Sequence, residues 1–332
     1  MKIRLGMLLF ALCGAVSAET LSVMSKPELR GFLDEMVSRH NFQRTELAAL
    51  FSQAELKPDI IEAISRPAEA KPWYEYRDIF LTSGRIEGGV EFWDEHAADL
   101  ARAEKTYGVP AEIIVAIIGV ETRYGKNTGS YRVLDALATL AFDYPPRSDF
   151  FRNELEQYLL LTREEKIPPL SLTGSYAGAM GLPQFIPSSF RSYAVDFDGD
   201  GRRDLWSNTS DAIGSVAHYF NEHGWQAGKA VVSRAEVSGE RYPDLLENGL
   251  KPALSMTQLR EQGVRASDPV PMDALGSLLQ FETESGMEYW VGLQNFYVIT
   301  RYNHSALYAM AVYQLSQQIR AQRLGTRGER RG

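Results

Sequence analysis

The stretch AEIIVAIIGVETRYG, residues 111–125, decides how the fold is interpreted. An almost unbroken apolar run after Pro110 predicts a buried helix, because proline suits the first helical turn, and Gly125 then ends the element. Glu121 stands at the C-terminal end of this run. Partial desolvation and the negative end of the helix dipole would both raise the pKa of its carboxyl group. That environment suits a general acid at neutral pH. The alternative is that Glu121 points to solvent where the helix frays.

The first 18 residues predict a secretory signal peptide, which is excluded from the fold. Lys2 and Arg4 precede a short apolar core, and residues 16–18 form a small-residue cleavage site. Cys13 raises the alternative of a lipid-attachment site. Leu12 is bulky where small residues are preferred, so we expect simple cleavage after Ala18 and a soluble product.

The composition, with 44% hydrophobic and 23% charged residues, is that of a globular protein. No later apolar run reaches about 20 residues, so no transmembrane segment is expected. Loss of Lys2 and Arg4 leaves 33 of the 35 basic residues against 43 acidic ones, a net charge of −10. This balance argues against nucleic acid as the main partner. The single cysteine lies in the signal peptide, which excludes disulfides and thiol catalysis from the rest of the chain.

Apolar residues recur at helical spacing along most of the chain. Helices are predicted in 26–66 (three short ones), 88–108, 133–143, 150–166, 211–225 and 293–319. Residues 229–290 differ, with strand-like runs at 230–237, 268–272, 278–284 and 287–293 around one helical piece at 255–263. The basic tail after Gln322 is expected to be disordered. The sequence therefore predicts a mainly α protein with a small β-rich insert.

The stretch DFDGDGRRD, residues 196–204, has the spacing of an EF-hand calcium loop. Gly201 stands where the sharp turn needs glycine, but position 12 is Ser207 instead of glutamate. The predicted ligands, most of them carboxylates, are Asp196, Asp198, Asp200, the carbonyl of Arg202, Asp204 and, as the last ligand, Asp211. We expect a structural Ca²⁺ ion here; the alternative is an acidic solvated turn.

Three further segments, at 173–187, 211–220 and 301–309, carry polar and aromatic side chains that suit carbohydrate. Aromatic faces lie on sugar rings, and amides pair with hydroxyl and acetamido groups. A glycine-rich loop at 173–187 can bring its backbone close to a ligand, and the stretch RYNHSALYA would carry its polar residues along one helix. The candidates are Ser175, Gln184, Tyr219, Tyr302, Asn303 and Tyr308. A helical tyrosine is more often a core residue, which is the alternative for each tyrosine.

Taken together, ETRYG, GSYAGAMGLPQFIPSSF, the acidic loop with DLW, DAIGSVAHYF with HGW, and RYN resemble the lytic murein transglycosylase B family, in that family's order. The resemblance spans about Phe92 to about Leu315. It implies a lysozyme-like core flanked by a helical domain and a small β domain. The predicted boundaries are 1–18 (signal peptide), 19–72 (helical domain), 73–228 (catalytic core), 229–290 (β subdomain), 291–320 (C-terminal helix) and 321–332 (basic tail).

The resemblance implies non-hydrolytic cleavage of the β-1,4 bond between N-acetylmuramic acid and N-acetylglucosamine in peptidoglycan, with a 1,6-anhydro product. Glu121 matches the family's acid and base, and the other candidates match residues that face the sugar. The acidic loop matches a calcium site, with one extra residue between Leu205 and Asp211. Asp135, Asp143 and Asp149 are scattered over helices and make poor second carboxylates. The substrate's N-acetyl group, oriented by Asn303 and Ser175, would take that role.

The expected partner is the glycan strand of peptidoglycan, and the expected location is the periplasm, as a soluble protein instead of a lipoprotein. Partners among cell-wall synthesis proteins stay open. One alternative function is a lysozyme-type muramidase, which would give reducing-end sugars and need a positioned water. The other is a calcium-stabilised wall-binding module without catalysis, for which Glu121→Gln would change nothing.

Overall fold

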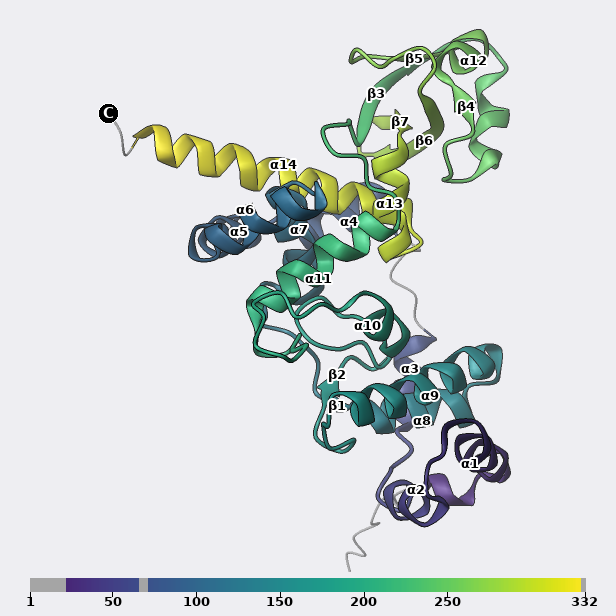
Figure 1. The fold of residues 1–332 in the computed structure, drawn as a ribbon. Helices are drawn as coiled ribbons and strands as arrows, with labels where there is room; N and C mark the ends of the chain where they lie inside the picture. The colour runs from purple at the N-terminus through teal and green to yellow at the C-terminus, as the bar shows by residue number, and fades with distance from the viewer. Residues whose placement is uncertain (1–21, 66–70, 330–332) are drawn as a thin grey trace, which may run out of the picture.

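The predicted helix around residues 111–122 forms the centre of the fold. The computed structural model describes residues 22–65 and 71–329. Helix α7 (Ala111–Thr122) has ten of its twelve residues buried, so it is covered on all sides. It packs against α5 (Ser83–Glu95), α6 (Ala97–Tyr107), α11 (Thr209–Glu222) and α14 (Ala306–Glu329). Figure 1 shows this group in the middle of the molecule. The mainly α, lysozyme-like class is confirmed.

A second group of helices lies at the end of the molecule opposite the β subdomain (Figure 1). It contains the three short predicted helices and two longer ones: α1 (Pro27–His40), α2 (Arg44–Phe51), α3 (Pro58–Ile64), α8 (Val133–Asp143) and α9 (Ser148–Glu164). Two contacts join the N-terminal part to the later helices: a hydrogen bond between His40 and Glu156, and an ion pair between Arg152 and Glu35. The helices of 19–72 therefore pack on α8 and α9, and the domain boundaries stay a prediction.

The remaining elements that precede the β subdomain are short and lie before or between the longer helices. They are a 3₁₀ turn at Val23–Ser25, α4 (Trp73–Phe80), β1 (Tyr131–Arg132), a 3₁₀ turn at Pro145–Arg147, β2 (Thr173–Gly174) and α10 (Pro187–Tyr193). Strands β1 and β2 pair antiparallel and fix the start of the glycine-rich loop. Gly129 is required there, because a Cβ atom would lie 2.0 Å from the carbonyl oxygen of Gly174. The sequence did not predict α10.

The β subdomain is a five-stranded antiparallel sheet with the order β4-β6-β7-β3-β5. The strands are β3 (Val232–Val237), β4 (Leu254–Ser255), β5 (Val264–Ala266), β6 (Leu275–Thr283) and β7 (Gly286–Gly292), with a 3₁₀ turn at Tyr242–Asn248. Helix α12 (Met256–Glu261) begins with a capping box of Ser255 and Gln258. The predicted strand at 268–272 is wrong: Pro269 and Pro271 cannot donate ladder hydrogen bonds. Strands β4 and β5 were not predicted.

The last predicted helix, 293–319, is in fact two helices. Helix α13 (Gln294–Tyr302) ends where Asn303 adopts an extended backbone, and α14 begins at Ala306. The side chain of Ser305 accepts a hydrogen bond from the amide of Tyr308, which starts the new helix. Tyr302, Asn303 and Tyr308 therefore do not share one helix, and that expectation is wrong.

The basic tail is also more ordered than predicted, since α14 continues to Glu329. Arg323 forms an ion pair with Asp94 at 2.8 Å and lies over the ring of Trp93 at 4.4 Å, which holds the helix against α5. The predicted signal peptide, with Cys13, and part of the linker between α3 and α4 lie outside the described residues. Within the described part of the chain, no helix combines the length and the apolar character that crossing a membrane would need.

Candidate active site

Glu121 occupies the last turn of α7, where the sequence places it. The helix end does not fray: the amide of Arg123 bonds to the carbonyl of Gly119, and that of Tyr124 to Ile118. Arg123 and Tyr124 both adopt left-handed backbone angles, which turn the chain sharply after the helix. Thr122 stabilises this turn, because its hydroxyl accepts the amide of Gly125 and bonds to the carbonyl of Leu182. The turn fixes the direction of Glu121.

The carboxyl group of Glu121 is set up to exchange a proton near neutral pH. The hydroxyl of Tyr308 donates a hydrogen bond to Oε1 of Glu121 at 2.5 Å. Burial raises the pKa of Glu121 to about 7, although the hydrogen bond from Tyr308 lowers it. Among the described residues, no second carboxylate acts on the pKa of Glu121. Burial, which the sequence predicted, is therefore the dominant cause of this shift.

Three tyrosines form the aromatic wall beside Glu121. The rings of Tyr302 and Tyr308 are stacked with centroids 6.5 Å apart, and those of Tyr219 and Tyr302 meet edge-on at 4.9 Å. Tyr302 donates to the carbonyl of Pro183 at 2.5 Å and Tyr219 to that of Arg301 at 2.6 Å. Burial raises the pKa of all three, so they stay neutral donors. These tyrosines are thus packed core residues that also line the site.

A cavity of 310 Å³ opens beside this wall. Of the predicted sugar-binding residues, it brings together Gln184, Tyr219 and Tyr302. The side-chain nitrogen of Gln184 donates to the carbonyls of Thr128 and Gly181, which ties the glycine-rich loop to the segment after α7. Sequence reasoning missed the other lining residues: Arg147, Phe150, Phe185, Ile186, Ser189, Arg301 and His304. Phe185, Ile186 and Ser189 lay inside the quoted motif GSYAGAMGLPQFIPSSF, and Arg301 and His304 lay inside the quoted stretch RYNHSALYA.

Ser175 and Asn303 are not joined to Glu121 by a hydrogen bond in this structure. The hydroxyl oxygen of Ser175 accepts the amides of Ala177 and Ala179, so it shapes the glycine-rich loop. Asn303 lies in the extended link between α13 and α14, one residue after Tyr302. Its side-chain amide makes no hydrogen bond to any described residue, and it is partly exposed. Both side chains keep capacity to bind a ligand.

The acidic loop gathers three of its predicted ligands. Oxygen atoms of Asp196, Asp198 and Asp211 lie within 4.8 Å of one another. The carboxylate of Asp196 accepts the amides of Gly199, Asp200 and Gly201, which folds the loop around it. Three carboxylates this close repel one another, and a hard cation such as Ca²⁺ would relieve the repulsion. The donor set fits calcium.

Asp211, Asp204 and Asp200 also accept hydrogen bonds from the backbone of the loop. Asp211 is buried and accepts the amides of Phe197 and Asp204, so it anchors the loop to α11. The carboxylate of Asp204 caps the next turn through the amides of Trp206 and Ser207. Asp200 accepts the amide of Arg202 and is exposed. All six residues stay predictions as metal ligands, and the structure brings the carboxylates of Asp196, Asp198 and Asp211 together.

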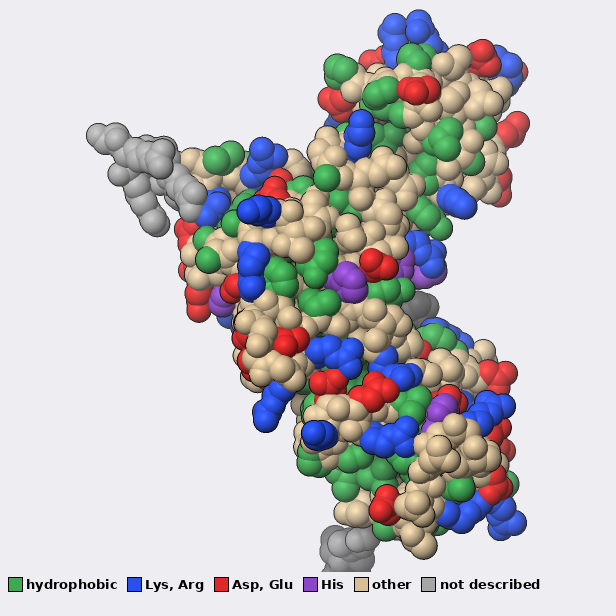
Figure 2. All heavy atoms as spheres, viewed as in Figure 1, with side chains coloured by type: hydrophobic (Ala, Val, Ile, Leu, Met, Phe, Trp, Pro, Cys, Tyr) green, Lys and Arg blue, Asp and Glu red, His purple; other side chains and the backbone are tan. Residues whose placement is uncertain are grey.

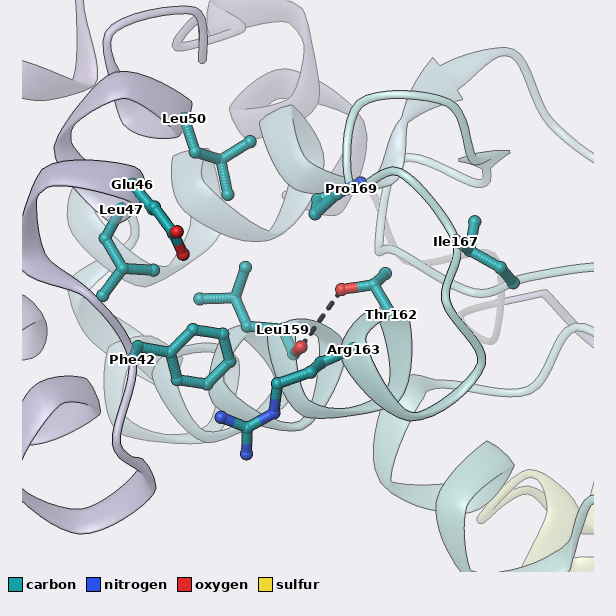
Figure 3. A pocket seen from close by; sticks show the side chains of 9 residues that line it. All are labelled: Phe42, Glu46, Leu47, Leu50, Leu159, Thr162, Arg163, Ile167 and Pro169. Atoms are coloured by element: carbon teal, nitrogen blue, oxygen red, sulfur yellow. Dashed lines mark hydrogen bonds between the residues drawn. The ribbon is translucent and has the colours of Figure 1, made fainter.

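Two other surface features lie apart from this site. An apolar pocket of 260 Å³ lies where α2 meets α9, with Leu50, Phe42 and Leu159 around it (Figure 3). It contains none of the predicted site residues. On the face shown in Figure 2, acidic and basic side chains are interspersed without one large patch of either sign.

Comparison with known proteins decides the family. Residues 24–317 match the model of the transglycosylase SLT domain, which covers α7, the aromatic wall and the acidic loop. This chain belongs to that transglycosylase family. The transglycosylase is 46% identical over 307 residues to the membrane-bound lytic murein transglycosylase B of Escherichia coli, covering 89% of this chain and 83% of that protein. The resemblance found in the motifs is therefore confirmed.

Solved structures of relatives share the fold of the transglycosylase. The lytic transglycosylase SltB1 of Pseudomonas aeruginosa is 58% identical, with a TM-score of 0.86 over 90% of this chain and 98% of that one. Slt35 of E. coli, solved with calcium, is 46% identical, with a TM-score of 0.83 over 90% and 94%. SltB3 of P. aeruginosa, solved with NAG-NAM-pentapeptide, is 31% identical, with a TM-score of 0.78 over 88% and 79%. The enzyme class is thereby shown.

Proposed function

We propose that this lytic transglycosylase cleaves the β-1,4 bond between N-acetylmuramic acid and N-acetylglucosamine without water. The observation that carries the proposal is the hydrogen bond from the hydroxyl of Tyr308 to the partly buried carboxyl of Glu121, whose pKa burial raises to about 7. A carboxyl with a pKa near the working pH can give a proton and later take one back. The solved complex of SltB3 with NAG-NAM-pentapeptide supports the same substrate class here.

In the first step, neutral Glu121 protonates the glycosidic oxygen and the bond from that oxygen to the anomeric carbon breaks. The carbonyl oxygen of the substrate's own acetamido group attacks the anomeric carbon, which gives an oxazolinium-like intermediate. Ordinary glycosidases use a second carboxylate at this point. Among the described residues, the side chain that hydrogen-bonds to Glu121 is the hydroxyl of Tyr308 and not a second carboxylic acid, which favours participation of the substrate.

In the second step, ionised Glu121 takes the proton from the 6-hydroxyl of the muramic acid. That oxygen attacks the anomeric carbon, the oxazolinium ring opens, and a 1,6-anhydro sugar forms. The unpaired amide of Asn303 and the hydroxyl of Ser175 would orient the acetamido group. Gln184, Tyr219 and Tyr302, which line the cavity, would form the sugar subsites together with Tyr308, and the tyrosines would offer their aromatic faces.

For the acidic loop we propose a structural Ca²⁺ held by Asp196, Asp198 and Asp211, completed by Asp200, Asp204 and the carbonyl of Arg202. The gathered carboxylates and the calcium complex of Slt35 support this assignment. The ion would neutralise the loop and hold the start of α11, which carries Tyr219. It would take no part in the bond cleavage, because the loop carboxylates are used as ligands.

The proposed location is the periplasm, after removal of residues 1–18. The support is the sequence of that segment, with its basic start, short apolar core and small-residue cleavage site. The curated E. coli relative is named as membrane-bound, whereas Leu12 before Cys13 disfavours lipid attachment in this chain. Labelling with a radioactive or clickable palmitate analogue separates the two cases, because a soluble periplasmic enzyme would carry no label.

Mass spectrometry of digested peptidoglycan tests the reaction itself. Muropeptides lighter by one water than hydrolysis products are expected, and they would establish the anhydro product. Products with free reducing ends would instead favour a lysozyme-type muramidase, the alternative that the sequence left open. No release of muropeptides from intact sacculi by correctly folded protein would favour a binding module.

A further inference from the structure

The turn that follows helix α7 holds two consecutive residues in an unusual backbone conformation. Arg123 and Tyr124 have φ angles of 50° and 62°, in the left-handed region that side chains other than glycine seldom adopt. Such a conformation persists only where the surrounding structure holds it. Arg123 is exposed, whereas Tyr124 is half-buried. The side-chain packing of Tyr124 therefore joins the hydrogen bonds of Thr122 in holding this turn.

The ring of Tyr124 lies in a slot whose walls are glycines of two helices. On α7, a Cβ atom at Gly119 would lie 2.5 Å from the hydroxyl oxygen of Tyr124 and 2.6 Å from the ring carbon that bears it. On α5, a Cβ atom at Gly89 would lie 2.6 Å from the same oxygen, and one at Gly88 would lie 3.1 Å from the ring. Glycine inside a helix lowers helix stability relative to alanine. The close approach of the ring is the physical reason for glycine at these positions.

Polar and aromatic contacts hold the ring of Tyr124 in this slot. Its hydroxyl donates to the carbonyl of Arg85 at 2.7 Å, and its ring centroid lies 5.6 Å from that of Phe92. Both partners belong to α5. Burial raises the pKa of the Tyr124 hydroxyl, so it stays a neutral donor. The side chain therefore has one packed orientation, fixed by α5 on one side and α7 on the other.

The slot is linked to the catalytic carboxyl by contacts on two sides. The amide of Tyr124 donates to the carbonyl of Ile118 at 3.3 Å, three positions before Glu121 in α7. Across the slot, a Cβ atom at Gly89 would lie 2.5 Å from Cδ1 of Ile319. Ile319 belongs to α14, the helix whose tyrosine donates a hydrogen bond to Glu121. One junction of α5, α7 and α14 therefore holds both the carboxyl and its hydrogen-bond donor.

We propose that Tyr124 is a positioning residue for the reaction: its ring, seated between Gly89 and Gly119, directs the carboxyl of Glu121 toward the glycosidic oxygen. The inference rests on the function proposed above and adds the residues that orient the acid. Tyr124 does not line the cavity beside the aromatic wall, so its effect reaches the sugar through Glu121. A displacement of the acid by about 1 Å can cost about a hundredfold in rate. Binding of the sugar would be preserved, so the loss belongs to kcat and not to KM.

The test is a double-mutant cycle between the ring and the wall of the slot. Tyr124→Leu removes the ring atoms that Gly119 approaches, Gly119→Ala adds the Cβ atom, and the double variant combines the two changes. Gly84→Ala is one matched control, because Gly84 also lies in α5 and nothing is within 4 Å of its Cβ position. The other is Tyr242→Leu, a half-buried tyrosine of the β subdomain whose ring lies 5.4 Å from that of Tyr289. On soluble glycan strands, kcat and KM are measured from pH 5 to 9, below the melting temperature of every variant.

For Tyr124→Leu and for Gly119→Ala alone, we expect kcat to fall about a hundredfold while KM stays within about twofold. In the Tyr124→Leu background, Gly119→Ala should cost less than about threefold, because the ring that the new methyl group would meet is gone. The alkaline limb of kcat should move to lower pH in Tyr124→Leu, since a carboxyl that leaves its buried position has its pKa lowered toward 4.5. Tyr124→Phe keeps the ring and should restore most of kcat. Both controls should keep the wild-type kcat.

An equal cost of Gly119→Ala with and without the ring would overturn the proposal. So would a lowered melting temperature with kcat and its alkaline limb unchanged, because that result would show a merely structural role. Carbon NMR of labelled glutamate, assigned with Glu121→Gln, measures the pKa of Glu121 without reference to the reaction. The same pKa of Glu121 in the wild type and in Tyr124→Leu would also overturn the proposal. The product masses of the wild type report separately on the proposed reaction, so a failure of that function is distinguishable.

Discussion

The hydroxyl of Tyr308 donates a hydrogen bond to the carboxyl of Glu121 across 187 positions of sequence. The two residues meet because α14 lies along α7, so a contact between helices sets the state of the catalytic carboxyl. Burial raises the pKa of Glu121 and the bond from Tyr308 lowers it, leaving a value of about 7. The balance between these two effects underlies the first three predictions.

Replacing the acid should stop the reaction while the protein stays folded. Glu121→Gln removes the only proton donor in the proposed mechanism, and we expect cleavage of peptidoglycan to fall by at least about a thousandfold. Release of soluble muropeptides measures this loss. Glu112→Gln is the matched control, since Glu112 lies at the other end of α7 and pairs with Arg320. Cleavage retained by folded Glu121→Gln would exclude the assignment.

Removing the hydroxyl of Tyr308 should move the pH profile. Tyr308→Phe deletes the hydrogen bond that lowers the pKa of Glu121, so this pKa should rise. Because the first step needs the protonated acid, the alkaline limb of kcat should shift to higher pH. Rates measured from pH 5 to 9 would show it. Tyr313→Phe, on the same helix, should leave the limb unmoved, and an acidic shift in Tyr308→Phe would contradict the assignment.

The raised pKa of Glu121 should also destabilise the fold at alkaline pH. The folded pKa of about 7 exceeds the ordinary value of 4.5, so the neutral carboxyl is favoured in the folded state. Its contribution is fully present below pH 4.5 and is lost as pH rises through 7. Glu121→Gln should therefore gain stability over the wild type between pH 4 and 8, by up to about 3 kcal/mol. Urea unfolding of both proteins at pH 4 and at pH 8 measures this gain. An equal difference in unfolding free energy between variant and wild type at the two pH values would refute the prediction.

Removal of calcium should lower the melting temperature. A ligand at about 100 times its Kd stabilises the native state by about 2.7 kcal/mol, so a saturating chelator should produce a clear shift that added Ca²⁺ reverses. Asp198→Asn should abolish the calcium-dependent part, because Asp198 belongs to the gathered carboxylates. Asp244→Asn, an exposed acid in the β subdomain, should keep it. A melting temperature unaffected by chelator would remove the calcium assignment.

The helices with strong apolar periodicity were predictable from sequence because their burial pattern is local. Helices α1, α2, α3, α8, α9 and α11 fall close to the predicted ranges. The errors concern short elements. Strands β4 and β5 have two and three residues and exist through their pairing with β6 and β3, which no local pattern encodes. The break at Asn303 was missed for a similar reason, since apolar residues continue at helical spacing on both sides of it.

The sequence by itself determined that Glu121 ends a buried helix and that Asp196 and Asp198 lie in one tight loop, because hydrophobic period and turn chemistry act over a few neighbouring residues. Only the tertiary structure decided what those groups meet. It placed Tyr308 on Glu121, brought Asp211 to the loop, and packed the ring of Tyr124 against Gly119. Such pairings depend on how distant helices pack, and the pKa of a carboxyl depends on all the atoms that exclude water from it.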